Sequence, residues 1–200
     1  MATKAKQALR LQSPAAKQAL QLQLQHADAS DFTWFKIAAF DRQDYKTDLG
    51  GNISLWPDSP KEKLASCAFE YTDKERQGSE GCSLKIAYDI DAAKDGATGI
   101  KIDLEMPDLA KGHYNLVFLV KGDKEKGYTT RFKVKLESPS GSAIKIAEDI
   151  TSEWKQVYLP FSMFEGNIDW NKVSAMYIIF DIDSVTEKKG IIYIDAIFLN

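Results

Sequence analysis

The sequence is poor in the residues that build most catalytic and metal centres. Its 200 residues include two histidines, His26 and His113, and two cysteines. Transition-metal sites gather several such side chains, so no such site is expected. No HExxH, P-loop, GxGxxG, GxSxG or CxxC motif occurs. A Ser-His-Asp triad would need His113, which follows a glycine and is better interpreted as a surface-turn residue. The sequence therefore predicts a protein that is not an enzyme.

Strong net charge and long apolar runs are missing as well. The formal net charge of −3 gives no basic footprint, so nucleic-acid binding is not expected. No run of about eighteen apolar residues could span a membrane. Basic residues open the chain as in an export signal, but glutamine at every second place in Leu20–Gln25 breaks the apolar region that a working signal peptide needs. Export by another route remains open, and we expect a periplasmic or extracellular protein.

Residues 1–30 contain no aromatic residue and differ in composition from the rest of the chain. An echo, AKQALRLQ from Ala5 and AKQALQLQ from Ala16, is offset by eleven residues, which keeps equivalent positions on one helical face. Pro14 separates the copies and fits the start of a helix. The segment is predicted to be a leader, either two short helices or disordered, that could hold a protein partner.

From residue 31 to residue 200 the apolar pattern changes to a period of two. In the clearest strand Phe132, Val134 and Leu136 alternate with basic residues. The other predicted strands are 84–88, 100–104, 114–120, 156–161, 176–182 and 191–199, and turn signals separate them. The runs 114–120 and 176–182 are almost continuously apolar, so both faces of these strands are expected to be covered. The prediction is one all-β domain, an antiparallel β-sandwich of the jelly-roll type.

The two cysteines flank a turn-like stretch. If Cys67 and Cys82 lie in a hairpin centred near Lys74 and Glu75, they are opposite each other and can form a disulfide. Such a bond would contribute about 3 kcal/mol and would imply an exported protein. The alternative is two buried free thiols.

Seven phrases in order resemble the galactose-binding-like jelly-roll superfamily. They are most similar to family-11-type carbohydrate-binding modules and to the domain of complex I intermediate-associated proteins. The phrases are AFD at 39–41 with LGGNISLW at 49–56, GCSLKIAYD at 81–89, YNLVFLVKG at 114–122, TSEWKQV at 151–157, PFS at 160–162 and IYIDAI at 192–197. In this pattern Trp154 and Trp170 correspond to structural residues. Most related domains bind glycans, and some act in assembly.

The resemblance also implies a structural calcium ion, held by Asp41 and Asp195 and completed by backbone carbonyls and oxygens near Glu80 and Gly81. Asp195 lies inside the apolar run 191–197. Burying an unpaired carboxylate there would destabilise the fold by roughly several kcal/mol. The alternative is that Asp195 accepts backbone N–H groups or pairs with a lysine. The sequence departs from the pattern at Ala196, where a second Asp is frequent.

We therefore expect a non-catalytic domain that binds a glycan or polysaccharide across one sheet face. The candidate ligand-binding residues are Trp56, beside a proline-containing loop, and three side chains predicted to point outward, Arg131, Lys133 and Tyr158. The basic residues of the 130–137 strand weaken the case for an aromatic sugar platform. The alternatives are a protein-interaction or assembly domain of the same fold and, second, a small glycoside-acting enzyme with paired carboxylates.

Overall fold

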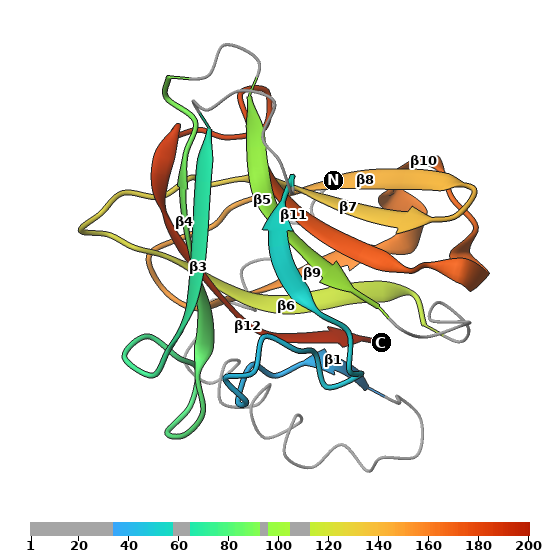
Figure 1. Ribbon diagram of the computed structural model, residues 1–200, viewed down its shortest axis with the longest axis horizontal. Coiled ribbons are helices and arrows are strands. Elements are labelled where there is room, and N and C mark those ends of the chain that lie inside the picture. The colour runs from blue at the N-terminus through green and yellow to red at the C-terminus, as the bar shows by residue number, and fades with distance from the viewer. Residues whose placement is uncertain (1–33, 58–64, 93–95, 105–112) are drawn as a thin grey trace, which may run out of the picture. The chain divides into compact units, whose positions relative to one another are not determined.

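Two antiparallel sheets account for nearly all the regular structure (Figure 1). The computed structural model describes residues 34–57, 65–92, 96–104 and 113–200, which belong to one compact unit, Trp34–Asn200. The sheets face each other as a sandwich, so the predicted all-β jelly-roll class is confirmed.

The first sheet, here called the β12 sheet, is built around the longest strand. Its order is β3 (Ser66–Thr72), β4 (Ser83–Asp89), β12 (Lys189–Leu199), β6 (Asn115–Gly122) and β9 (Lys155–Pro160), and β1 (Phe35–Ala38) pairs with the last residues of β12. The second, the β11 sheet, has the order β10 (Glu165–Asn167), β8 (Gly141–Ala147), β7 (Phe132–Ser138), β11 (Ala175–Asp181), β5 (Ala97–Asp103) and β2 (Ile53–Trp56). Two short 3-10 helices, η1 (Phe161–Met163) and η2 (Trp170–Lys172), lie between β9 and β11.

The core between the sheets follows from the period-two pattern. On β7, Phe132, Val134 and Leu136 are buried, and the residues between them are only partly buried. Phe180 of β11 stacks on Tyr88 of β4, with ring centroids 4.1 Å apart. Burying each such side chain contributes roughly 1.5–3 kcal/mol, so these contacts hold the sheets together.

The predicted strands all occur, with ends that differ by a few residues. The prediction that both faces of 176–182 are covered is confirmed up to residue 180, because every residue of β11 before Asp181 is buried. The sequence did not reveal the four-residue strands β1 and β2, nor β8 and β10. β8 begins with Gly and Ser and carries Lys145 opposite Val134, which blurs its alternation. β10 is a three-residue edge strand with no buried side chain.

The predicted disulfide is wrong, and both cysteines are free thiols. β3 and β4 do form a hairpin, but its register pairs Cys67 with Tyr88 and Thr72 with Ser83. The hairpin is therefore centred near Gln77 and Gly78 rather than near Lys74 and Glu75. The two thiols lie toward opposite ends of the hairpin, too far apart to bond. Burial raises the pKa of Cys67 to about 12.

Some predictions fall outside the described residues. The leader at 1–30 and its suggested protein partner are among them, and so is part of the loop after Trp56. Within the described ranges, no helix has the length and hydropathy needed to cross a membrane.

Candidate functional site

The outer face of the β11 sheet carries an aromatic pair. Trp56 ends β2, and its ring meets that of Tyr177 edge to face, with centroids 6.0 Å apart. Tyr177 is only 5% exposed and belongs to an apolar cluster separate from the core, together with Ala175 and Ile179. The β11 sheet therefore has a covered centre on its outer side, with Trp56 packed against it.

Tyr177 is fixed from its other side by charged residues of β7. The Lys135 ammonium lies 4.4 Å from the centre of the Tyr177 ring. The Tyr177 hydroxyl donates to Oε1 of Glu137 at 3.0 Å, and Glu137 also forms an ion pair with Lys135. Partial burial acts to raise the pKa of Glu137, but the hydrogen bonds from Lys135 and Tyr177 outweigh it, and the pKa falls below its ordinary value.

Two more ion pairs flank this group. Lys133 of β7 pairs with Asp181 of β11, and Lys101 of β5 pairs with Asp103 at 2.8 Å. For Asp181, burial acts to raise the pKa, and hydrogen bonds from Lys133 and Ser184 outweigh it, so the pKa is lowered. The face thus presents ammonium donors and carboxylate acceptors in fixed positions beside an aromatic ring. Such a combination can orient a polar ligand that has an apolar side.

The structure brings together only some of the predicted ligand-binding residues. Trp56 and Lys133 lie on this outer face, and Arg131 is exposed immediately before β7. Tyr158 does not join them, because β9 belongs to the β12 sheet. The residue is 47% exposed, as the alternation predicted, but on the other sheet. Alternation within a strand gives the side of a sheet, not which sheet the strand enters.

Three residues of this group were not proposed as ligands from the sequence: Tyr177, Lys135 and Glu137. A signal for each was available. The alternation that points Lys133 outward does the same for Lys135 and Glu137. Tyr177 brings a hydroxyl into an otherwise apolar stretch, and that hydroxyl needs a partner in a strand covered on both faces.

The predicted calcium ligands lie where β12 changes neighbours. β4 pairs with β12 as far as Ile194, and β1 pairs with it from Ile197 onward. Asp195 occupies the irregular step between them and is 6% exposed. Its Oδ2 accepts the N–H of Gln77 at 3.0 Å. The alternative interpretation, a buried carboxylate satisfied by backbone, is therefore realised at least in part.

A second carboxylate lies close to Asp195. Burial raises the pKa of Asp195 to about 6; the N–H of Gln77 opposes this shift, and the charge of Asp41 adds to it. A β-carbon at Gly81 would come within 2.0 Å of Oδ1 of Asp41, and Gly81 has φ of +83°. Glycine thus leaves Asp41 room that another residue would fill. Two adjacent carboxylates, one of them buried, suit a cation.

Glu80 does not complete this pair. It is exposed in the hairpin loop, and in the ranges 34–57, 65–92, 96–104 and 113–200 no three His, Cys, Asp or Glu side chains come together as a metal site. A calcium ion here would take most of its roughly six to eight oxygens from backbone carbonyls and water. Asp41 and Asp195 therefore fit a calcium ion only if backbone carbonyls and water supply the remaining ligands.

No family model and no curated protein matches this sequence. Solved structures do match. A family 11 carbohydrate-binding module of the cellulosomal cellulase Lic26A-Cel5E of Clostridium thermocellum has 16% identity and a TM-score of 0.63, over 85% of this chain and 95% of the module. A family 11 module from the same organism in complex with a β-1,3-1,4-mixed-linked tetrasaccharide has 16% identity and a TM-score of 0.63, over 83% and 94%. The CBM22-1 xylan-binding domain of Paenibacillus barcinonensis Xyn10C has 12% identity and a TM-score of 0.50, over 84% and 92%.

These likenesses extend over nearly the whole length of each module, so they concern the complete sandwich and not a shared fragment. The predicted resemblance to family-11-type modules is confirmed at the level of the fold, and the resemblance to the complex I intermediate-associated domain stays a prediction. The described residues between 34 and 200 have the same jelly-roll fold as these modules.

Proposed function

We propose that the protein is a non-catalytic module that binds a polysaccharide chain on the outer face of the β11 sheet. The observation that carries this proposal is the packing of Trp56 on Tyr177 between fixed ion pairs. An aromatic ring can stack on the apolar face of a sugar, while lysine and carboxylate groups exchange hydrogen bonds with its hydroxyls. Similar modules in complex with a mixed-linked tetrasaccharide or named for xylan support this ligand class.

Binding is expected to be weak and to involve no turnover. One aromatic ring, Trp56, lies at the edge of the covered centre, so we expect dissociation constants on the order of micromolar to millimolar. Arg131, exposed beside Lys133, would add a hydrogen-bond donor at the end of the bound chain. With a polysaccharide as ligand, we propose that the protein works in the periplasm or outside the cell.

We also propose that Asp41 and Asp195 hold a structural calcium ion. It would balance two neighbouring carboxylates and tie the loop after β1 to β12 and to the β3–β4 hairpin through Gln77. The ion would stabilise the fold and would not contact the glycan, because these residues belong to the other sheet.

Native affinity electrophoresis in gels containing mixed-linked β-glucan, xylan or agarose tests the main proposal. The wild-type protein should be retarded by at least one polysaccharide, and Trp56→Ala should lose most of that retardation. Trp34→Ala is the matched control, because Trp34 is also partly exposed but packs on Phe198 of β12. Retardation that survives Trp56→Ala would place the site elsewhere, and no retardation by any polysaccharide would favour the assembly function.

A further inference from the structure

The β12 sheet carries a groove of its own on its outer face, on the opposite side of the sandwich from Trp56. Its volume is about 700 Å³, within the range of ligand pockets. The floor includes Tyr193 of β12 between Lys85 of β4 and Lys121 of β6, which the register places side by side. The walls are formed by the β3–β4 hairpin on one side and by residues 123–125 and 152–153 on the other.

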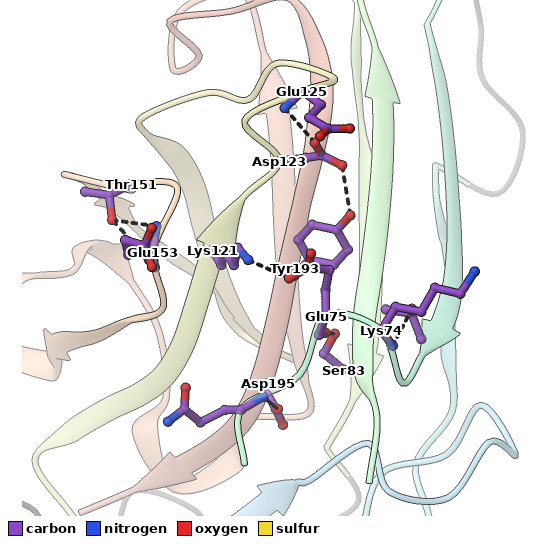
Figure 2. Close-up of polar contacts among 12 residues, drawn as sticks. Lys74, Glu75, Ser83, Lys121, Asp123, Glu125, Thr151, Glu153, Tyr193 and Asp195 are labelled. Atoms are coloured by element: carbon purple, nitrogen blue, oxygen red, sulfur yellow. Dashed lines mark hydrogen bonds and ion pairs between the residues drawn. The ribbon is translucent and has the colours of Figure 1, made fainter. Parts of the chain in front are cut away.

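Contacts across the groove hold its walls in place (Figure 2). Lys121 reaches across the floor to Oε2 of Glu75 in the hairpin at 2.5 Å. The Tyr193 hydroxyl donates to Oδ2 of Asp123 at 2.9 Å, and Oδ1 of Asp123 accepts the N–H groups of Glu125 and Lys126 at 2.9 and 3.0 Å. The site is therefore formed before any ligand arrives, which lowers the entropic cost of binding.

The hairpin wall is also anchored from behind. The Ser83 hydroxyl donates to the carbonyl of Glu75, and the N–H of Gln77 donates to the buried Asp195. Lys85 pairs with Glu70 at 2.7 Å where the hairpin leaves the sheet. The wall is thus attached to β12 and β4 at separate points and cannot fold over the groove without breaking them.

The charges of the groove select the kind of ligand. Its lining contains both carboxylates and ammonium groups: Glu70, Asp73, Glu75, Asp123, Glu125 and Glu153, with Lys74, Lys85, Lys121 and Lys124. With six carboxylates against four ammonium groups the lining would repel a polyanion, and a polycation would have to displace lysines already paired with carboxylates. A neutral polyhydroxylated molecule can donate to the carboxylates and accept from the lysines at the same time. Tyr193 is 6% exposed and offers no stacking surface, so binding would depend on hydrogen bonds.

We propose that this groove is a second glycan-binding site, for a neutral oligosaccharide segment, so that one domain binds two chains on its opposite faces. The proposal rests on the proposed function for the ligand class but uses different residues. The two sites would bind neighbouring chains of the same polysaccharide. Binding at both sites raises the overall affinity of the domain even though neither site gains a contact.

Two-dimensional NMR titration with a β-1,3-1,4-mixed-linked tetrasaccharide separates the sites. In the wild-type protein we expect saturable shifts in two groups, around Trp56 and around Lys121 and Tyr193. Trp56→Ala should weaken the first group at least tenfold and leave the second. Lys121→Met, which keeps the apolar stem, should do the reverse, and so should Glu75→Gln, which keeps the shape of the hairpin. Lys172→Ala, at an exposed position outside both sites, should change neither.

The outcomes of the two proposals differ. If Trp56→Ala abolishes all shifts, the groove is not a site and the proposed function stands. If only the groove responds in the wild-type protein, the groove stands and the β11-sheet face does not. A groove that prefers polygalacturonate to the neutral tetrasaccharide would overturn the ligand class.

Discussion

The two outer faces of this sandwich are built in different ways from the same kind of strand. On the β11 sheet, the centre is a covered aromatic pair, and the ion pairs lie within β7 or between β7 and β11, all inside the sheet itself. On the β12 sheet, the centre is charged, and its walls come from the hairpin and loops that rise above the strands. The first face suits a chain lying flat on an aromatic edge. The second suits a segment held by its hydroxyls.

The comparison shows what sets the character of a sheet face. Both central strands carry an outward tyrosine with a low exposure, Tyr177 and Tyr193, and each hydroxyl donates to a carboxylate. Lysines of both adjacent strands also flank each ring. The difference lies beyond them: Trp56 of β2 packs on the first ring, whereas the β3–β4 hairpin and nearby loops form walls around the second. Elements beyond the directly paired residues therefore give the two faces their different character.

The largest expected effect is a difference between truncating Tyr177 and truncating Tyr193. Tyr177→Ala should lower the free energy of unfolding by about 3 kcal/mol, because it leaves a void under Trp56. It should also remove glycan binding by the β11-sheet face, whereas Tyr193→Ala should destabilise the protein and leave that binding intact. Urea denaturation and affinity electrophoresis measure both effects. Tyr177→Phe, which loses only one hydrogen bond, should cost about 1 kcal/mol. If Tyr177→Ala lowers the free energy of unfolding by less than Tyr177→Phe does, the ring is not packed in a cluster as described.

Calcium should act on the β12 side alone. With free calcium at a hundredfold excess over its dissociation constant, the fold should gain about 2.7 kcal/mol, and chelator should lower the melting temperature by several degrees. Asp195→Asn should melt at one temperature with or without chelator. Glycan affinity of the β11-sheet face should be unchanged by chelator, which isothermal titration can check. Indifference of the wild-type melting curve to chelator would rule out the ion.

A smaller difference between the two faces is expected in how their partly buried carboxylates, Asp181 and Asp123, stabilise the fold as the pH and the salt concentration change. The pKa of Asp181 is lowered in the fold, so its contribution is present above the ordinary carboxyl pKa and is lost as the pH falls through the folded value. Asp181→Asn should therefore cost roughly 0.5–1 kcal/mol at pH 7, and the cost should shrink as the pH falls below the ordinary carboxyl pKa. The pKa of Asp123 is lowered too, against burial, by N–H groups of Lys126 and Glu125 and by Tyr193. Because Asp181 depends on a lysine, 1 M salt should weaken its contribution more than that of Asp123. Urea denaturation of the wild-type protein and of the Asp181 and Asp123 variants, at low salt and at 1 M salt, measures these contributions. Equal salt-dependent losses of stability at the two positions would show that the distinction is wrong.

The smallest effect is expected at Tyr158. The residue is 47% exposed on β9, away from the β11-sheet face and outside the lining of the groove. Tyr158→Ala should change stability by less than about 0.5 kcal/mol and leave both glycan affinities unchanged. A clear loss of binding would restore it as a ligand residue and would shift the site toward β9.

The sequence predicts where the strands lie in the chain better than it predicts which strands pair with each other in a sheet. Alternation around Phe132 gives β7 and its outward lysines because side-chain direction is a local property. Tyr158 shows the limit, since the sheet that a strand joins depends on contacts distant in the sequence. Cys67 and Cys82 show a second limit: the register of a hairpin depends on its loop, and a shift of a few residues separated the thiols. Asp195 was identified because a charge in an apolar run needs a partner, but its contact with Gln77 follows from the irregular step in β12.

One measurement tests the central claim most directly. The four tryptophans give separate indole N–H signals in a spectrum of the labelled protein, and the tetrasaccharide can be titrated against all of them. The indole of Trp56 should shift saturably, while that of Trp170, packed between Phe161 and Phe164, should stay in place. An unmoved Trp56 signal at saturating ligand would contradict glycan binding on the β11-sheet face.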